Sequence, residues 1–155
     1  MSSEGTARRA ERRDVDALVA LRAEMFTAMG AEGTRAWQPE ARRWFAERLD
    51  SPDHGFFVVE ADGEVVAGAV GAVRDAAPSP AVPHGRDVLI SNVCNFADHR
   101  GRGFGRQAFD AVLAWARGTG VGRAELMATE AGRVLYERAG FTEVAFPAMR
   151  VTLTS

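Results

Sequence analysis

Apolar residues follow two different spacings along this chain. From Phe104 onward they recur every three or four residues, at Ala108, Val112 and Trp115, which predicts the buried face of a helix. The apolar run at 88–96 is short and has no helical period, which predicts a strand directly before that helix. The pattern therefore predicts a fold that combines helices and strands.

Capping and turn residues divide the rest of the chain into further elements. Asp14 precedes a series of apolar residues at helical spacing, and Gly30 ends this predicted helix. Asp62-Gly63 lies between two apolar runs, as expected of a hairpin turn. The predicted elements are a strand at 6–10, helices at 15–29 and 39–51, strands at 56–60, 65–73 and 88–96, a helix at 104–118, a strand at 124–128, a helix at 130–138, and strands at 141–146 and 149–153. This order, βααβββαβαββ, predicts one α/β domain spanning 1–155, with a mixed sheet and helices on its faces.

The composition is that of a globular protein and excludes several classes of function. Hydrophobic residues make up 46% of the 155 residues and charged residues 26%. The formal net charge of -2 argues against a nucleic-acid-binding domain, whose surface is usually basic. All 19 positive side chains are Arg, so the chain lacks the Lys that a Walker-type phosphate loop, a Schiff-base enzyme or a pyridoxal phosphate enzyme needs.

Cysteine and histidine give no sign of a metal site. The single Cys excludes an internal disulfide and a multi-cysteine site, and the spacing of His54, His84 and His99 is not that of metal ligands. The polar start of the chain does not resemble a signal peptide, and no apolar run reaches membrane length. We therefore expect a cytoplasmic protein without a bound metal and without a membrane partner.

The loop at 100–105 has the features of a phosphate-binding site. It carries three glycines and lies between the predicted central strand and the start of a helix. Glycines allow a ligand to approach the backbone, and the first helical turn offers unpaired N–H groups at the positive end of the helix dipole. Arg100, Arg102 and Arg106 add charges that suit phosphate oxygens.

Two other interpretations of this loop fit less well. A dinucleotide-binding fold needs the spacing G-x-G-x-x-G, whereas Gly101, Gly103 and Gly105 give G-x-G-x-G after a late strand. A nucleic-acid clamp would use the arginines on a phosphate backbone, but one short basic loop on an acidic chain is weak support for it. We expect no nucleic-acid partner.

Two motifs resemble the GCN5-related N-acetyltransferase (GNAT) superfamily. The segment Arg100-Gly101-Arg102-Gly103-Phe104-Gly105 is similar to its Arg/Gln-x-x-Gly-x-Gly/Ala signature, and 135–141, which reads LYERAGF, looks like its LYE-x-x-GF segment. The two motifs are about thirty residues apart with a strand between them, a combination far more specific than either alone. The resemblance implies a GNAT-like, mostly antiparallel sheet flanked by about four helices.

The resemblance also implies a site for acetyl-CoA as cosubstrate. In such enzymes the loop amides hold the pyrophosphate, and the pantetheine arm runs beside the central strand like an added strand. The positions implied for acetyl-CoA binding are Val93, Cys94, Asn95, Arg100, Gly101, Arg102, Gly103, Phe104, Gly105 and Arg106, with a weaker contact from Thr129, where many relatives have asparagine.

Tyr136, the only tyrosine, falls where the family carries its proton donor. Its predicted role is to protonate the departing thiolate while an amine attacks the thioester directly in a ternary complex. From the residues alone, a helix tyrosine that packs its ring in the core explains this position as well. A backbone amide near Cys94 or Asn95 is expected to donate to the thioester carbonyl.

The sequence does not identify the general base. Glu24 and Glu130 are candidates, although each also suits a solvated helix charge. Asn92 and Cys94 share one face of the predicted strand and are expected to lie toward the acetyl group, but Asn is no base at neutral pH, and a lone strand Cys is usually buried and inert. Trp37 is expected to line the acceptor pocket.

These observations favour an acetyl-CoA-dependent N-acetyltransferase acting on a primary amine of a small molecule or peptide. The alternative is a catalytically weak acyl-CoA-binding sensor or regulator of the same fold, since no base is evident. A homodimer is possible because such folds commonly pair through their late strands. The acceptor is not determined by the sequence, because the segments that relatives use for it diverge.

Overall fold

The computed structural model describes residues 4–31 and 33–154, and a single five-stranded sheet lies at its centre. The strands are β1 (Thr6–Arg9), β2 (His54–Ala61), β3 (Glu64–Arg74), β4 (Asp87–Asn95) and β5 (Ala124–Leu126), in the order β1-β2-β3-β4-β5. The first four strands pair antiparallel, whereas β5 runs parallel to β4. At the hairpin between β2 and β3, Asp62 and Gly63 have φ values of 53° and 79°, as the Asp-Gly turn predicts.

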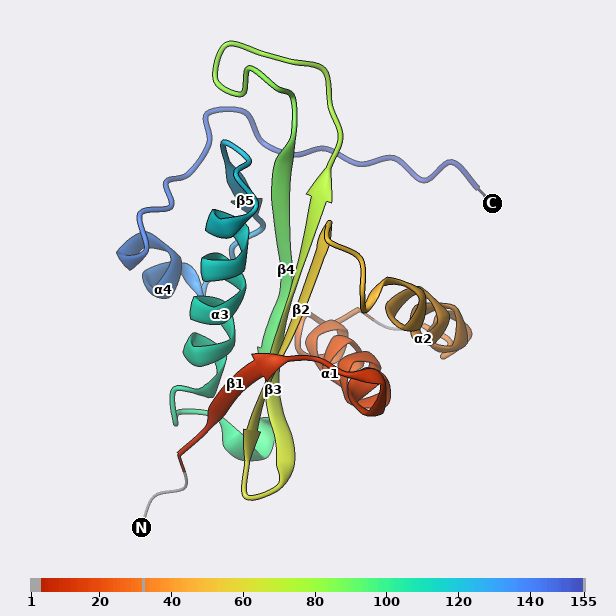
Figure 1. The fold of residues 1–155 in the computed structure, drawn as a ribbon. Coiled ribbons are helices and arrows are strands. Elements are labelled where there is room, and N and C mark those ends of the chain that lie inside the picture. Colours follow the sequence, from red (N-terminus) through yellow and green to blue (C-terminus); the bar gives the residue numbers. More distant parts are fainter. Residues whose placement is uncertain (1–3, 32, 155) are drawn as a thin grey trace.

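Helices cover both faces of the sheet (Figure 1). The helices α1 (Val15–Ala28) and α2 (Trp37–Arg48) lie on one face, and α3 (Phe104–Gly118) and α4 (Arg133–Arg138) lie on the other. Two short 3-10 helices, η1 (Arg12–Asp14) and η2 (Ala97–His99), precede α1 and α3. In the part of the chain that the structure describes, no helix is long and apolar enough to cross a membrane.

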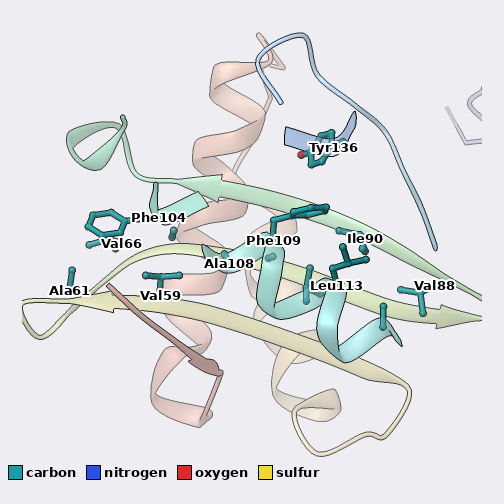
Figure 2. Packing of buried hydrophobic residues seen from close by; sticks show 14 residues of the cluster. Val59, Ala61, Val66, Val88, Ile90, Phe104, Ala108, Phe109, Leu113 and Tyr136 are labelled. Atoms are coloured by element: carbon teal, nitrogen blue, oxygen red, sulfur yellow. The ribbon is translucent and has the colours of Figure 1, made fainter. Parts of the chain in front are cut away.

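The core has two parts, one on each side of the sheet. The part between α3 and the sheet contains the predicted stripe residues Phe104, Ala108 and Val112, together with strand residues and Tyr136 (Figure 2). The other part lies under α1 and α2 and includes Phe45. A Cβ at Gly71 would lie 2.7 Å from the ring of Trp115, so the glycine makes room for α3 against β3.

Asp14 stands at the start of α1, as predicted, but its carboxylate does not cap that helix. The side chain is 3% exposed and accepts hydrogen bonds of 2.7 and 3.0 Å from Arg8 and one of 2.7 Å from the Glu11 amide. Burial opposes ionisation, but these hydrogen bonds outweigh it and lower the pKa of Asp14. The residue therefore ties β1 to the turn before α1.

The predicted fold class is confirmed: the sheet is mixed and mostly antiparallel, with four α-helices. The last two predicted strands were wrong, because 141–146 and 149–153 form no strand among the described residues. Apart from Phe141, which packs against the core, their apolar side chains are exposed, 63% for Val144 and 79% for Val151. An alternating pattern predicts a strand, but a strand also needs a neighbouring strand to accept its backbone hydrogen bonds, and these segments have none among the described residues.

Candidate functional site

The second half of β4 has a strand neighbour on one side only. β5 pairs with Val88, Leu89 and Ile90, and within the described residues no strand continues along 91–95 on that side. On the other side, Ser91 pairs with Val70 and Cys94 pairs with Gly68. Between these two pairs β4 advances by three residues and β3 by only two, so β4 contains one extra residue. This extra residue forms a β-bulge on the β3 side of β4. The unpaired backbone edge is on the opposite side of 91–95, where the pantetheine arm is predicted to bind.

Asn92 lies in this bulge with a φ of 55°, in the left-handed region. The strict alternation that would place Asn92 and Cys94 on one face is therefore interrupted. The Asn92 side chain is 3% exposed, and its Oδ1 atom has no hydrogen-bond partner among the described residues. A buried hydrogen-bond acceptor without a donor is rare in folded proteins, and the Oδ1 atom of Asn92 is such an acceptor within the candidate site.

The glycine loop and the start of α3 follow directly after η2. Gly101 and Gly103 have φ values of 79° and 80°, and an added Cβ at either would meet no atom within 4 Å. Gly103 is the N-cap of α3, and its carbonyl accepts the first helical bond, from the Gln107 amide, at 3.1 Å. The amides of 104–106 come before the first helical hydrogen bond and therefore have no acceptor within α3. They point out of the helix end, toward the open space beside the glycines.

The three arginines of the loop have different surroundings. Arg100 lies 3.7 Å from the carboxylate of Glu24 on α1, and Arg106 lies 3.8 Å from Asp110 one turn further along α3. Arg102 lies over the ring of Phe104, at 5.3 Å from its centroid. The side chains of Arg100 and Arg106 are 56% and 67% exposed, so both can still reach an anion in solvent.

Tyr136 lies in α4 and is 8% exposed. Its ring packs edge-on against Phe109 at 5.1 Å, and Figure 2 shows the two rings next to each other at the border of the core cluster. Burial raises the pKa of the Tyr136 phenol, and the neighbouring Cys94 raises it further. The ring therefore belongs to the core, as the packing interpretation expects, and the role of the phenol as proton donor stays a prediction.

Cys94, near the end of β4, interacts electrostatically with both Tyr136 and Glu24. Burial is the main cause that raises the pKa of the Cys94 thiol; Glu24 raises it further and Arg100 lowers it. The thiol therefore stays protonated at neutral pH, as expected of an inert strand cysteine. The electrostatic influence of Glu24 on the Cys94 thiol, and of Cys94 on the Tyr136 phenol, links three predicted site residues, whose roles stay predictions.

Trp37 begins α2 and packs edge-on against Phe26 of α1, with 5.5 Å between ring centroids. The guanidinium of Arg22 lies over the other ring of this pair, 5.0 Å from the centroid of Phe26. Burial lowers the pKa of Arg22, and no carboxylate pairs with it among the described residues. Sequence reasoning missed Arg22, because nothing in a helical spacing distinguishes a half-buried arginine from a solvated one.

Thr129 and Glu130 lie in the turn before α4, which begins three residues later than predicted. The hydroxyl oxygen of Thr129 accepts a hydrogen bond of 3.2 Å from the Gly132 amide, so this side chain stabilises the turn. Its contact with acetyl-CoA stays a prediction. Glu130 is exposed, and its carbonyl accepts a hydrogen bond from the Arg133 amide at 3.4 Å.

Gly132 is a second residue that sequence reasoning missed. A Cβ at this position would lie 2.8 Å from Cε2 and 3.1 Å from the hydroxyl oxygen of Tyr136. The glycine therefore allows the phenol ring to lie directly against the turn that precedes α4. Only the spacing of four residues between Gly132 and Tyr136 could have indicated this contact.

Across residues 4–31 and 33–154, no group of three or more His, Cys, Asp and Glu side chains is arranged to hold a metal ion. His99 instead packs near Phe104, with 6.2 Å between ring centroids, and its carbonyl accepts a hydrogen bond from the Asn95 side chain at 3.2 Å. This bond fixes the end of β4 to the turn that begins the glycine loop.

The complete fold has close structural counterparts. A predicted acetyltransferase from Clostridium acetobutylicum, solved with acetyl-CoA, superposes with a TM-score of 0.85 at 23% identity, covering 97% of each chain. A GCN5-related N-acetyltransferase from Ralstonia eutropha JMP134 gives 0.83 at 27% identity, covering 96% of this chain and 99% of that one. Glucosamine-6-phosphate N-acetyltransferase from Arabidopsis thaliana gives 0.74 at 18% identity, covering 96% and 98%.

The sequence also matches a family model. The model of the acetyltransferase (GNAT) family covers residues 16–141, from the first helix to the end of the second motif. The chain therefore belongs to the GNAT acetyltransferase family, as its two motifs indicated. A search of curated protein sequences finds no significant match.

Proposed function

We propose that this protein is an N-acetyltransferase that transfers the acetyl group of acetyl-CoA to a primary amine by direct attack in a ternary complex. Family membership supports acetyl transfer, and a structural counterpart was solved with acetyl-CoA. The finer statement depends on one observation: the unpaired edge of β4 leads directly into the left-handed glycine loop at the start of α3, with the Tyr136 phenol beside that edge.

The residues of this edge and loop fit the donor substrate. Acetyl-CoA supplies a thioester, two amides in its pantetheine arm and a pyrophosphate. The backbone of 91–95 would bind the two amides as an added strand, and the amides of 104–106 would bind the pyrophosphate. The open space beside Gly101 and Gly103 is the room that phosphate oxygens need near the backbone.

Tyr136 would act as the general acid. Because its pKa is raised, the phenol keeps its proton at neutral pH and can give it to the departing thiolate. The edge-on contact with Phe109 holds the ring in place without using its hydroxyl group. A phenol fixed in this way needs little reorganisation when the thiolate leaves.

Glu24 is the better of the two predicted bases. It lies next to Cys94 and the edge of β4, whereas Glu130 lies exposed in the turn before α4. Its carboxylate would accept the proton of the attacking amine, directly or through a water molecule. The backbone of Cys94 would help to bind the pantetheine arm. Its thiol would not form an acyl-enzyme, because it stays protonated. Trp37, with Phe26, would line the acceptor side.

Thiol release from acetyl-CoA over a panel of small and peptide amines tests this function. We expect turnover with at least one primary amine and a roughly 10²- to 10⁴-fold lower kcat for Tyr136→Phe, the range of a single general acid. Calorimetry should find nearly unchanged affinity for acetyl-CoA, since the substitution keeps the buried ring.

The other outcomes are equally informative. Tight binding of acetyl-CoA with no thiol release for any amine would support the sensor or regulator interpretation instead. An unchanged kcat in Tyr136→Phe would remove the phenol from the mechanism while leaving acetyl transfer intact.

A further inference from the structure

Arg22 of α1 is a half-buried cation whose charge no carboxylate compensates. In the part of the chain that the structure describes, its guanidinium makes no ion pair or side-chain hydrogen bond, and it lies over the ring of Phe26, 5.0 Å from the centroid. Hydrogen bonds to carboxylates raise the pKa of Arg8 and of Arg74, whereas burial lowers the pKa of Arg22. The ring attracts the charge but uses none of the N–H donors, so Arg22 has donors available for a ligand.

The sequence around Arg22 supplies no acidic neighbour on the helix. Residues three and four positions away on a helix are the ones whose side chains meet, and here all of them are apolar: Leu18, Val19, Met25 and Phe26. Arg43 of α2, by contrast, pairs with Glu40 three residues earlier, at 3.0 Å. Arg106 of α3 pairs in the same way with Asp110, four residues later. Arg22 therefore differs from the solvated helix arginines of this chain both in burial and in its neighbours.

The turn of α1 that carries Arg22 packs on the sheet next to the unpaired part of β4. A Cβ added at Gly68 of β3 would lie 3.0 Å from Cδ1 of Leu21, so Leu21 packs directly on that glycine. Gly68 pairs with Cys94, which belongs to the part of β4 that β5 leaves unpaired. The helix also contacts β4 itself. Arg22 follows Leu21 in the chain and is therefore placed close to the proposed site.

Arg22 and Glu24 leave this turn on opposite sides. Successive residues of a helix are rotated by about 100°, so when Leu21 faces the sheet, Arg22 and Glu24 lie on the two flanks of the sheet-facing stripe. Glu24 lies on the flank of the glycine loop, 3.7 Å from Arg100. Arg22 lies on the flank of Phe26, whose ring packs against Trp37 of the neighbouring helix α2 (Figure 1). The cation is thus on the side where the acceptor is predicted to bind, and away from the phosphate loop.

We propose that Arg22 binds an anionic group of the acceptor, so that the acceptor is an amine that also carries a carboxylate or a phosphate. This inference rests on the proposed function and names the substrate class for it. The planar guanidinium can donate two parallel hydrogen bonds to the oxygens of either anion, and the ring of Phe26 supports its face. An ion pair formed at a half-buried cation is also stronger than one formed in bulk water. The amine end of the acceptor would then extend across the helix stripe toward Glu24.

Matched pairs of amines test this inference on the unmodified chain. Thiol release from acetyl-CoA is measured with ω-amino acids of increasing length, each compared with its own amide, and with aminoethyl phosphate compared with ethanolamine. We expect kcat/KM to be at least about tenfold higher for the anionic member of one or more pairs, because only that member can pair with the guanidinium. The pairs that show the preference tell a carboxylate from a phosphate. Equal kcat/KM within every pair would overturn the inference.

Arg22→Gln and Arg42→Gln are the variants that assign the preference to one residue. The first removes the half-buried charge, and we expect the ratio of kcat/KM between the anionic and the neutral amine to fall to near one. Arg42 is the matched control on α2, since it is 50% exposed and pairs with Asp16 at 2.7 Å. Its variant should keep the ratio of the unmodified chain. A ratio that survives in Arg22→Gln, or that falls equally in both variants, would contradict the assignment.

Calorimetry with the same amines separates this inference from the proposed function. The unmodified chain is first saturated with CoA, which has no acetyl group to transfer, and is then titrated with each amine. Anionic amines that bind more tightly than their neutral counterparts, without thiol release from acetyl-CoA, would support the anion site and contradict acetyl transfer. Acetyl transfer to both members of every pair alike, with equal binding, would support the proposed function and overturn the role of Arg22.

Discussion

At the scale of single residues, the arrangement around Tyr136 depends on how closely Gly132 approaches its ring. The glycine has a φ of -91°, which any residue can adopt, so only the missing Cβ distinguishes it. Tyr136 lies one helical turn later, and its ring fills the space that a side chain at 132 would take. Gly132 is therefore a positioning residue for the phenol and touches no substrate itself.

Gly132→Ala should displace the phenol without straining the backbone. A Cβ at 2.8 Å from the ring forces it to move, and we expect kcat to fall roughly tenfold or more while affinity for acetyl-CoA stays within about twofold. Steady-state thiol release and calorimetry measure the two quantities. The pH profile adds a readout that a structural role would not change: because burial raises the pKa of Tyr136, the midpoint for loss of the acid form should lie above its ordinary value of 10.0. Full activity in Gly132→Ala would contradict this role.

At the scale of elements, an ion-pair cluster joins the ends of β3, β4 and β5. Arg74 donates to both carboxylate oxygens of Asp87 at 2.9 and 2.8 Å and to Glu125 at 3.1 Å, and Arg123 lies 3.5 Å from Asp87. The Asp87 side chain is 7% exposed. The hydrogen bond from Arg74 is the main cause that lowers the pKa of Asp87, against the opposing effect of burial. The cluster lies at the start of β4, beside the residues that pair with β5, and so ties the ends of three strands together.

Asp87→Asn should destabilise the protein in a pH-dependent way. At pH 7 we expect a loss of about 1.5–3 kcal/mol, the range for hydrogen bonds to charged groups. The folded pKa lies below the ordinary 3.8, so the stabilisation is present above that pH and is lost as pH falls through the folded value. Urea unfolding at pH 7 and near pH 2 should show the difference from the unmodified chain shrinking.

Asp53→Asn is the matched control, because Asp53 pairs with Arg86 at 2.9 Å but is 52% exposed. Its loss should cost about 0–1 kcal/mol at pH 7. Equal losses for the two variants, or an Asp87→Asn effect that does not depend on pH, would refute the importance of the buried pair.

The elements also mark where sequence reasoning succeeds and where it stops. Helical stripes such as Phe104 to Trp115 and the Asp62-Gly63 turn are local patterns, and the structure confirms them. The bulge at Asn92 depends on the register between β3 and β4, which no local pattern contains. The strand pattern at 149–153 was visible, but whether a strand forms depends on a neighbour that the sequence cannot place.

At the scale of the whole molecule, the residues proposed for the donor and those proposed for the acceptor come from opposite faces of the sheet. The glycine loop and α4 approach β4 from the side of α3, whereas Glu24, Phe26 and Trp37 come from α1 and α2 on the other side. Cys94, in the part of β4 that β5 no longer pairs, interacts electrostatically with both Tyr136 and Glu24. The proposed acid and the proposed base therefore belong to helices on opposite faces of the sheet. The compartment of the protein and its acceptor amine stay predictions.

Calorimetric titration with acetyl-CoA, comparing Gly103→Ala with Gly105→Ala, tests the central claim most directly. An Ala at 103 keeps φ near 80° at a cost of roughly 1–2 kcal/mol and places a methyl group in the open space beside the loop amides. An Ala at 105 has a helical backbone and only an ordinary contact, 3.7 Å from Asn95 Oδ1. We expect the unmodified chain and Gly105→Ala to bind acetyl-CoA alike and Gly103→Ala to bind at least tenfold more weakly while staying folded. No binding to the unmodified chain, or equal binding by all three, would contradict the account.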